Sequence, residues 1–330
     1  MSIAKIIGLG TYLPKKVLTN ADLEKMVDTS DEWITTRTGI KERRIAEEEV
    51  TSDMGYYAAQ NAIDDANVSV DDIDFILVAT LTPDYIFPST ACLIQNRLKA
   101  INAAALDIQA ACSGYVYALC LAKALVESKT YKNILIIASE KLSSIVNYKD
   151  RTTSVLFGDG AAAAVVSLKG KGLEIESTYL GADGSASNLL ILPAGGSKLP
   201  ASFDTVKDQK HFLQMEGKEV FKHAVRRMQQ AIEKCLSNAN LTDQEIAWII
   251  PHQANERIIE AIGKRFSHLP QERIFREVVQ KFGNTSASSV GIVLDILKKR
   301  NVLKNKDRIL LTVFGAGFTW GSAILRNNLE

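Results

Sequence analysis

The chain has 330 residues, 46% of them apolar and 23% charged, which is typical of a globular protein with about two domain-sized units. The formal charge of +1 predicts no nucleic-acid partner and no membrane surface as a partner, and no apolar run approaches the roughly 18 residues that a spanning helix needs. The four cysteines show no CxxC or metal-ligand spacing and the segment MSIAKIIGLGTYLP is unlike a signal peptide, so we expect a reduced, cytoplasmic protein.

Strand-sized apolar runs alternate with helical patterns along the first half of the chain. The runs expected to form strands are residues 4–10, 74–80, 103–108, 133–139 and 161–168. The amphipathic stretch at residues 51–66 is expected to form a helix between the first two strands. This alternation predicts a layered α/β fold.

The second half of the chain repeats the same rhythm. It contains, in order, a strand-like run at 173–181, a helical pattern at 217–239, and apolar runs at 247–251, 276–282, 308–314 and 321–326 separated by further helical stretches. The charged, glycine-rich segment LKGKGLE at residues 168–174 lies between the halves. We therefore expect an internal duplication, with one unit at residues 1–170 and the other at 171–330.

Two segments can be laid on each other to test the duplication. Residues 103–140 run strand, small-residue turn, apolar helix, charged turn and strand, and residues 276–317 follow the same order at nearly the same spacing. The segment REVVQKF is therefore expected to be a strand, and Cys112 and Ser286 fall at roughly corresponding helix starts. Two such units facing each other favour one site shared between the halves.

Cys112 precedes an apolar helix expected at residues 113–128, in which the first charged residue is Lys123. A thiol at a helix N-terminus lies at the positive end of the peptide dipole, so we expect a lowered pKa and a nucleophilic thiolate. The alternative is that the cysteine is a small apolar core residue, which is the interpretation we give to Cys92 and Cys120. The small neighbours of Cys112 leave room for a substrate and favour the nucleophile.

Polar residues follow two further apolar runs. His252 and Asn255 come directly after residues 247–251, where a parallel strand delivers side chains to a site, and Asn284 precedes a helical stretch. Singly, the histidine could be a structural hydrogen-bonding residue and Asn284 could be a helix N-cap. Together with Cys112, they favour a catalytic site.

Competing motifs carry less weight. The GxGxxA match at residues 158–163 leads into a strand rather than a helix, which disfavours dinucleotide binding. The sequence has neither a Walker A motif nor an HExxH pair. We expect no metal site and no cofactor.

The segments DIQAACSG (107–114), PHQAN (251–255) and GNTS (283–286) resemble β-ketoacyl-acyl-carrier-protein synthase III, and the similarity extends over essentially the whole chain. The resemblance implies the thiolase-like α/β fold, a five-layered α-β-α-β-α arrangement of two duplicated halves with mixed sheets. It also implies a homodimer. The implied reaction is a decarboxylative Claisen condensation of acetyl-CoA, or a short acyl-CoA, with malonyl-acyl-carrier protein to give acetoacetyl-acyl-carrier protein, CO₂ and CoA.

The resemblance also implies site residues. Cys112 would carry the acyl group, and His252 and Asn284 would hold the malonyl thioester carbonyl. The backbone N–H groups of Cys112 and of the residue matching Ala316 would form an oxyanion hole. Two neutral donors aimed at the enolate oxygen would stabilise the charge that decarboxylation develops.

Binding residues follow from the same resemblance. Trp33 and Arg37, four positions apart, look like the pair that sandwiches the adenine of CoA, although a solvated helix face is the alternative for such a pair. The other positions that match CoA contacts are Arg151, Phe221, Ala254 and Asn255. Lys218 departs from the family, in which the position usually holds an asparagine near the pantetheine.

Two further expectations concern partners. Phe87 matches the position that reaches across the dimer to close the acyl pocket, and a bulky ring there favours a short primer. The residues that match the basic patch for the acidic acyl carrier protein are Lys222, Arg257, Lys264 and Arg265. The alternative for Phe87 is an ordinary interface aromatic. The alternative for each of the basic residues is a place on a solvated helix face.

The predicted function is therefore the initiating condensation of fatty-acid synthesis by a ping-pong mechanism, with acetyl-CoA as a substrate. Two alternatives stay open. One is a related condensing enzyme of secondary metabolism that makes an alkylquinolone or polyketide precursor. The other is a non-catalytic acyl-binding subunit of the same fold, which would not need Cys112, His252 and Asn284 together.

Overall fold

The computed structural model describes residues 3–328 and is built around one mixed sheet of nine strands in the order β11-β12-β13-β8-β1-β7-β6-β4-β5. The strands are β1 (Lys5–Tyr12), β4 (Phe75–Ala79), β5 (Ala104–Ile108), β6 (Asn133–Glu140), β7 (Gly160–Ser167), β8 (Gly172–Ala182), β11 (Trp248–Pro251), β12 (Arg308–Gly315) and β13 (Thr319–Asn328). Two small sheets pair β2 (Lys16–Thr19) with β3 (Glu42–Ile45) and β9 (Leu190–Ile191) with β10 (Gln214–Met215).

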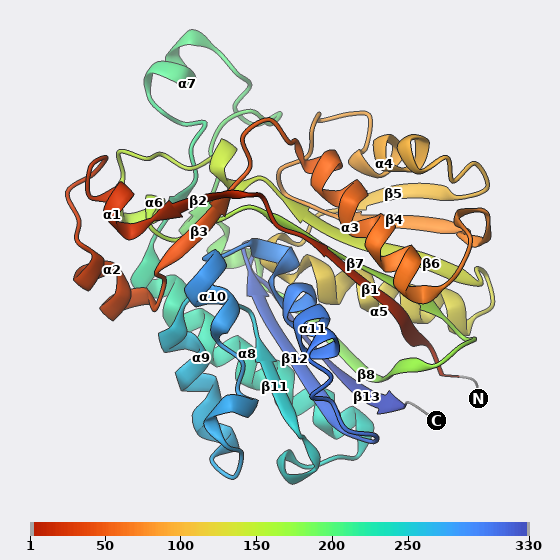
Figure 1. The fold of residues 1–330 in the computed structure, drawn as a ribbon. Helices are drawn as coiled ribbons and strands as arrows, with labels where there is room; N and C mark the ends of the chain where they lie inside the picture. The colour runs from red at the N-terminus through yellow and green to blue at the C-terminus, as the bar shows by residue number, and fades with distance from the viewer. Residues whose placement is uncertain (1–2, 329–330) are drawn as a thin grey trace.

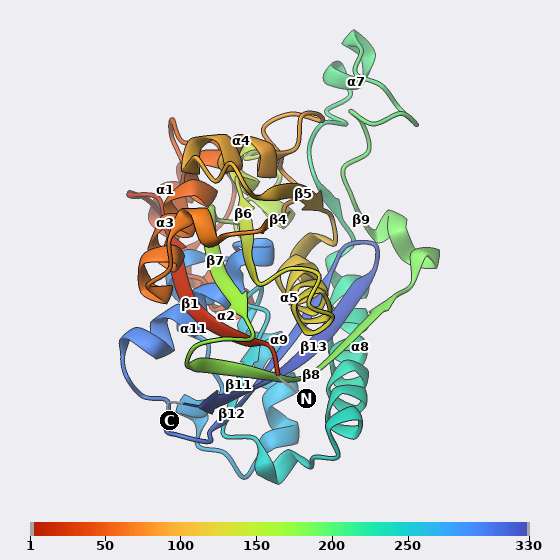
Figure 2. The same cartoon turned by 90° about the vertical axis from the view of Figure 1, so that its right-hand side faces the viewer.

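Helices cover and separate the two halves of this sheet. They are α1 (Asn20–Leu23), α2 (Asp31–Thr38), α3 (Thr51–Ala66), α4 (Thr90–Leu98), α5 (Gly114–Glu127), α6 (Arg151–Ser154), α7 (Phe203–Lys207), α8 (Gly217–Ala239), α9 (Glu256–Gly263), α10 (Glu277–Phe282) and α11 (Ser289–Lys299). Helices α3 and α4 lie on one outer face, α8 and α9 lie on the other, and α5 and α11 lie between the half-sheets (Figures 1 and 2). The predicted five-layered α-β-α-β-α fold is confirmed.

The two halves are related element by element. In the first half, β6 pairs parallel with β4 and antiparallel with β7. In the second half, β12 pairs in the same way, parallel with β11 and antiparallel with β13. Strands β1 and β8 occupy equivalent places and pair with each other, at Lys5 with Glu174 and Ile6 with Leu173, which joins the half-sheets. The change from β7 to β8 lies within the predicted junction at residues 168–174.

One predicted strand is wrong. The segment REVVQKF forms α10, and up to residue 328 the second half has no full counterpart of β5, only an isolated parallel bridge between Ile249 and Ile274. The buried Gln253 side chain explains the difference, because it donates to the Phe275 carbonyl (2.9 Å) and accepts from the Val279 N–H (3.3 Å). These bonds satisfy backbone groups that a sheet ladder would otherwise pair.

The predicted helices form where the apolar spacing places them. Residues 51–66 and 217–239 are helical as expected, and the latter ends at Asn240, whose left-handed φ of 54° is typical of a helix C-cap. Strand β7 is buried along its whole length because helices cover both of its faces. No helix within residues 3–328 is long and apolar enough to cross a membrane.

An arm of the chain projects from these layers. It runs from the end of β8 through β9 and α7 to β10, and α7 lies far from the body in both views (Figures 1 and 2). Phe203 at its tip is 97% exposed. The base of the arm returns to the body, where Leu190, Leu213 and Met215 form part of a cavity wall.

Candidate active site

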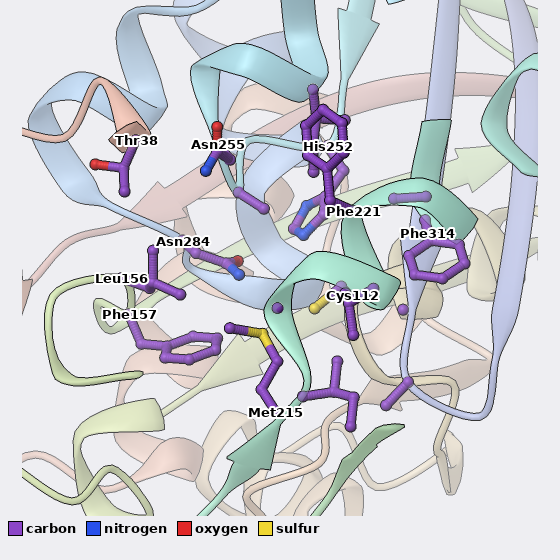
Figure 3. Close-up of a pocket in the computed structure, with 18 of the residues that line it drawn as sticks. Thr38, Cys112, Leu156, Phe157, Met215, Phe221, His252, Asn255, Asn284 and Phe314 are labelled. Carbon is purple, nitrogen blue, oxygen red and sulfur yellow. The ribbon is translucent and has the colours of Figure 1, made fainter. Parts of the chain in front are cut away.

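A cavity of about 860 Å³ lies where the two halves meet. Cys112 enters it from the first half, at the start of the central helix α5, whereas His252 follows β11 and Asn284 follows α10 in the second half. The three side chains converge on one region of the cavity (Figure 3). Residues of both halves therefore line one cavity, and the three residues predicted to be catalytic are among them.

Close packing holds Cys112 at the cavity floor. The residue is 8% exposed and lies in the single 3-10 turn Ala111–Ser113, which Ala111 enters with a left-handed φ of 45°. Gly114 opens α5 because a Cβ atom there would lie 2.8 Å from the Ala79 Cβ. The helix start thus comes close to the neighbouring strand and exposes the thiol to the cavity.

The expectation of a lowered cysteine pKa is wrong for this resting site. Burial is the main cause that raises the pKa of the Cys112 thiol from 9.0 to about 12; the hydrogen bond with Ser286 opposes this rise, and the buried carboxyl of Glu140 adds to it. A helix N-terminus contributes roughly 0.3–1 kcal/mol, less than the desolvation of a fully buried anion. Cys112 therefore rests as a thiol and must lose its proton when it reacts.

Two hydrogen bonds set the orientation of His252. Its backbone N–H donates to the Thr312 carbonyl of β12 (2.8 Å), and its Nδ1 lies 2.8 Å from Ser289 Oγ. Ser289 Oγ also accepts from the Gln253 N–H (3.4 Å), and its own proton can be donated to His252 Nδ1. In the tautomer that this donation favours, the ring proton is on Nε2, which then donates into the cavity.

Burial also keeps the imidazole uncharged. It lowers the pKa of His252 from 6.5 to about 4, and the residue is 5% exposed. A neutral N–H donor stabilises an adjacent oxyanion without delivering a full positive charge or a readily lost proton.

Asn284 is fixed through its backbone and its side-chain oxygen. Its N–H donates to the Leu156 carbonyl (2.8 Å), its carbonyl accepts from the Gly158 N–H (3.1 Å), and its Oδ1 accepts from the Ser286 N–H (2.9 Å). A backbone N–H can only donate, so Oδ1 must face Ser286. The Nδ2 group is left as a second donor into the cavity, beside the histidine (Figure 3).

The predicted oxyanion-hole residue Ala316 also lines the cavity, directly after β12. The backbone comes very close to the cysteine turn here, because a Cβ atom on Gly315 would lie 2.7 Å from the Cys112 nitrogen. Thr319 Oγ1 lies within hydrogen-bond distance of the carbonyls of Ala110 (2.9 Å) and Ala316 (3.2 Å) and donates its one proton to this pair, which ties the two segments together.

Aromatic and cationic groups gather at the cavity mouth. Trp33 and Arg37 lie on α2, and the guanidinium carbon of Arg37 is 5.1 Å from the Trp33 ring centre. Arg151 stands outside the cavity lining but stacks 4.9 Å from the same ring. Asn255 caps α9 and donates to the Arg37 carbonyl (3.1 Å), which joins the two helix ends.

The remaining predicted binding residues divide into two groups. Those that line the cavity are Lys218, Phe221, Lys222, Ala254 and Arg257. Arg265 is held away in ion pairs with Asp243 (2.9 Å) and Glu233 (3.0 Å), and Lys264 is exposed on the surface. Phe87 is 84% exposed and does not line the cavity of its own chain.

Glu140 is a residue of the site that the sequence did not predict. This residue ends β6 with 0% exposure, and its Oε1 accepts from Ser286 Oγ (3.0 Å), which itself lies 3.4 Å from Cys112 Sγ. A carboxylate closing the otherwise apolar run NILIIASE was the available signal. Within residues 3–328 no group of three or more His, Cys, Asp or Glu side chains is arranged to hold a metal ion.

Comparisons with known proteins give a consistent result. A family model described as 3-oxoacyl-[acyl-carrier-protein] synthase III matches residues 106–184, and the model of its C-terminal part matches residues 236–327. The chain is 56% identical over 325 residues to a β-ketoacyl-[acyl-carrier-protein] synthase III of Chlamydia muridarum, covering 98% of this chain and 99% of the relative.

Solved structures agree with these matches. The crystal structure of 3-oxoacyl-[acyl-carrier-protein] synthase III from Aquifex aeolicus is 48% identical with a TM-score of 0.89, covering 98% of this chain and 99% of that one. The priming β-ketosynthase of a polyketide biosynthetic pathway is 34% identical with a TM-score of 0.89, covering 99% of this chain and 96% of that one.

Proposed function

The chain belongs to the 3-oxoacyl-[acyl-carrier-protein] synthase III family and catalyses the condensation that initiates fatty-acid synthesis; on that premise we propose that Cys112 is its acyl carrier. The proposed reaction joins acetyl-CoA, or a short acyl-CoA, to malonyl-acyl-carrier protein and releases CO₂ and CoA. The observation that carries the residue assignment is the convergence of Cys112, His252 and Asn284 in one cavity (Figure 3).

In the first half-reaction, Cys112 Sγ attacks the thioester carbonyl of the acyl-CoA. The tetrahedral oxyanion would accept hydrogen bonds from the backbone N–H groups of Cys112 and Ala316, which close packing at Gly315 brings together. Collapse of the intermediate expels CoA and leaves the acyl group on Cys112.

In the second half-reaction, malonyl-acyl-carrier protein enters the same cavity. The His252 Nε2 and Asn284 Nδ2 groups donate to its thioester carbonyl, which stabilises the enolate that forms as CO₂ leaves. The enolate carbon attacks the acyl group on Cys112 and expels the Cys112 thiolate, which takes up one proton from solvent to regenerate the thiol. The fixed, neutral donors suit this step, since a charged imidazolium would protonate the carbanion.

Intact-mass analysis with a panel of acyl-CoAs tests the proposed function. An adduct of acyl mass on Cys112, released by malonyl-acyl-carrier protein, supports it. A polyketide-priming role is the second candidate, because a priming β-ketosynthase is 34% identical over nearly the whole chain. Preferential labelling by longer or branched acyl-CoAs would favour that candidate over the short primer.

The adenine of CoA is expected to bind between Trp33 and Arg37, with Arg151 as a further contact near the same ring. Replacing Arg37 with alanine should raise the KM for acetyl-CoA and leave that for malonyl-acyl-carrier protein nearly unchanged. A cation–π contact worth roughly 0.5–2 kcal/mol predicts an increase of roughly 2- to 30-fold. Steady-state kinetics with each substrate varied in turn measures the two values.

Arg97→Ala is the matched control, since it removes a guanidinium that stacks on the Tyr56 ring (4.1 Å) outside the cavity. It should change neither KM. Equal increases for both substrates in the Arg37 variant would contradict the proposed CoA site.

A homodimer is also proposed. Strand β5 is the last strand of the sheet, and the exposed apolar residues near it are Tyr85, Ile86, Phe87 and Leu106, with exposed fractions of 60%, 87%, 84% and 49%. An unpaired edge beside exposed apolar side chains is suited to burial against a second copy. In that dimer, Phe87 would close the acyl pocket of the partner.

Replacing Phe87 with alanine should therefore widen the primer range. The wild-type protein should acylate Cys112 faster with acetyl-CoA than with octanoyl-CoA, and the variant should raise the octanoyl rate by roughly tenfold or more. Phe203→Ala, which removes an exposed ring on the arm, is the control and should leave the rate of acylation by octanoyl-CoA unchanged. Faster octanoyl labelling in the wild type would contradict the short-primer assignment.

The acyl carrier protein is expected to meet Lys222 and Arg257 at the cavity mouth. Arg257 stacks over Phe221 at 5.6 Å, and among the described residues Lys222 pairs only with Glu219 on its own helix (2.7 Å), so both retain solvent-facing charge. Lys264 can extend this patch, whereas the ion pairs of Arg265 make it a weaker contributor. A cytoplasmic location is part of the same proposal.

A further inference from the structure

Glu140 is a buried carboxyl group that the proposed mechanism leaves without a role. Its Oε2 accepts three hydrogen bonds from the segment after β4: from Thr80 Oγ1 (3.1 Å), the Leu81 N–H (3.0 Å) and Thr82 Oγ1 (2.9 Å). Within residues 3–328 no Lys, Arg or His forms an ion pair with it. The group is therefore held in place entirely by neutral donors.

The other oxygen faces the nucleophile through one hydroxyl group. Glu140 Oε1 lies 3.0 Å from Ser286 Oγ, which lies 3.4 Å from Cys112 Sγ. A serine hydroxyl has one proton to donate. When Ser286 gives that proton to the carboxylate, its oxygen is free to accept the thiol proton, so the three groups form a continuous chain from sulfur to carboxylate.

The resting site also needs a proton acceptor. The thiol must lose its proton as it attacks, yet His252 is a poor candidate because its pKa is about 4 and Nδ1 already accepts from Ser289. Burial raises the pKa of Glu140 from 4.5 to about 7, which makes this carboxylate the more basic neighbour. Glu140 is thus both connected to the thiol and able to hold a proton.

We propose that Glu140 receives the thiol proton of Cys112 through Ser286 during acylation, an inference that rests on the proposed function of this site. As the sulfur forms its bond to the thioester carbon, the S–H proton passes to Ser286 Oγ and the serine proton passes to Glu140. The bond between the carbonyl carbon and the CoA sulfur then breaks. Glu140 returns its proton to Ser286 Oγ, and the serine hydroxyl gives its proton to the departing CoA thiolate, so this half-reaction gains and loses no net proton.

Two variants interrupt this relay at different atoms. Glu140→Gln keeps the size of the side chain but replaces the basic carboxylate with an amide that cannot take up the proton, and Ser286→Ala removes the bridging hydroxyl. Ser286 has a left-handed φ of 52°, and Ala111 adopts a φ of 45° in the equivalent turn of the first half, so alanine is compatible with that backbone. The Ser286 N–H that orients Asn284 is retained.

The test measures the rate of Cys112 alkylation by iodoacetamide and of acetylation by acetyl-CoA, both by intact mass. Each single variant should slow both reactions by roughly 10²-fold, and the double variant should be no slower than either, because one relay is broken only once. In both single variants, the rate of Cys112 acylation should fall more than the rate of malonyl decarboxylation. Asp159→Asn is the matched control, since Asp159 is an equally buried carboxyl that accepts hydrogen bonds from Ser143 rather than from Ser286.

Alkylation of Glu140→Gln close to the wild-type rate would overturn the relay, as would additive losses in the double variant or an equal loss in the Asp159 control. Failure of the proposed function looks different. In that case the wild-type protein would not be acetylated by acetyl-CoA, whereas the iodoacetamide rates would still report on Glu140 and Ser286.

Discussion

Replacing Cys112 with alanine is expected to abolish acyl-enzyme formation and to reduce condensation to background, a loss of roughly 10⁴-fold or more for removal of a covalent nucleophile. CO₂ release from malonyl-acyl-carrier protein should remain measurable, because the variant keeps the donors at His252 and Asn284. Intact mass follows the acyl adduct, and labelled CO₂ follows decarboxylation.

Cys92→Ala is a suitable control for this variant. Cys92 also lies in the first turn of a helix, but it is exposed, so its interpretation as a core residue is wrong, and it lies outside the cavity. Its removal should therefore leave the adduct and the condensation rate unchanged. Persistence of an acyl adduct in the Cys112 variant would place the acyl carrier elsewhere.

Replacing Asn284 with alanine should have the opposite effect on the two half-reactions. Loss of one of the two enolate donors should slow decarboxylation by roughly 10²- to 10³-fold, by analogy with removal of one oxyanion-hole donor. Cys112 should still be acylated, because its backbone oxyanion donors are untouched. The same pair of measurements, made after circular dichroism has shown that the variant is folded, separates the steps.

Asn327→Ala provides a matched control, since it removes a buried asparagine amide, bonded to the Lys304 carbonyl (2.9 Å), that lies outside the cavity lining. It should not alter either half-reaction. Normal decarboxylation in the Asn284 variant combined with failure to acylate Cys112 would reverse the assigned roles.

Much of the fold could be predicted because its signals are local. The helix α3 at residues 51–66 and the strand β7 both depend on apolar spacing within a short window of the sequence. The segment REVVQKF is the exception, because its two adjacent valines suit a strand or a helix equally well. The hydrogen bonds that decide for the helix come from Gln253, more than 20 residues away.

The candidate site was predictable to the extent that it lies at element ends. Cys112, His252 and Asn284 each follow or precede a regular element, so the topology brings them together. The depth of burial was not predictable from these positions, and it reverses the expected direction of the cysteine pKa. Glu140 was missed for a related reason, since its partners come from the segment after β4 and from the other half of the chain.

The most direct test of the account is a two-step labelling experiment on the wild-type protein. Incubation with acetyl-CoA, followed by intact-mass and peptide analysis, should show one acetyl group on the peptide that contains Cys112. Addition of malonyl-acyl-carrier protein should then remove that group and produce acetoacetyl-acyl-carrier protein together with CO₂. An adduct on another residue, or an acetyl group on Cys112 that malonyl-acyl-carrier protein does not remove, would contradict the account.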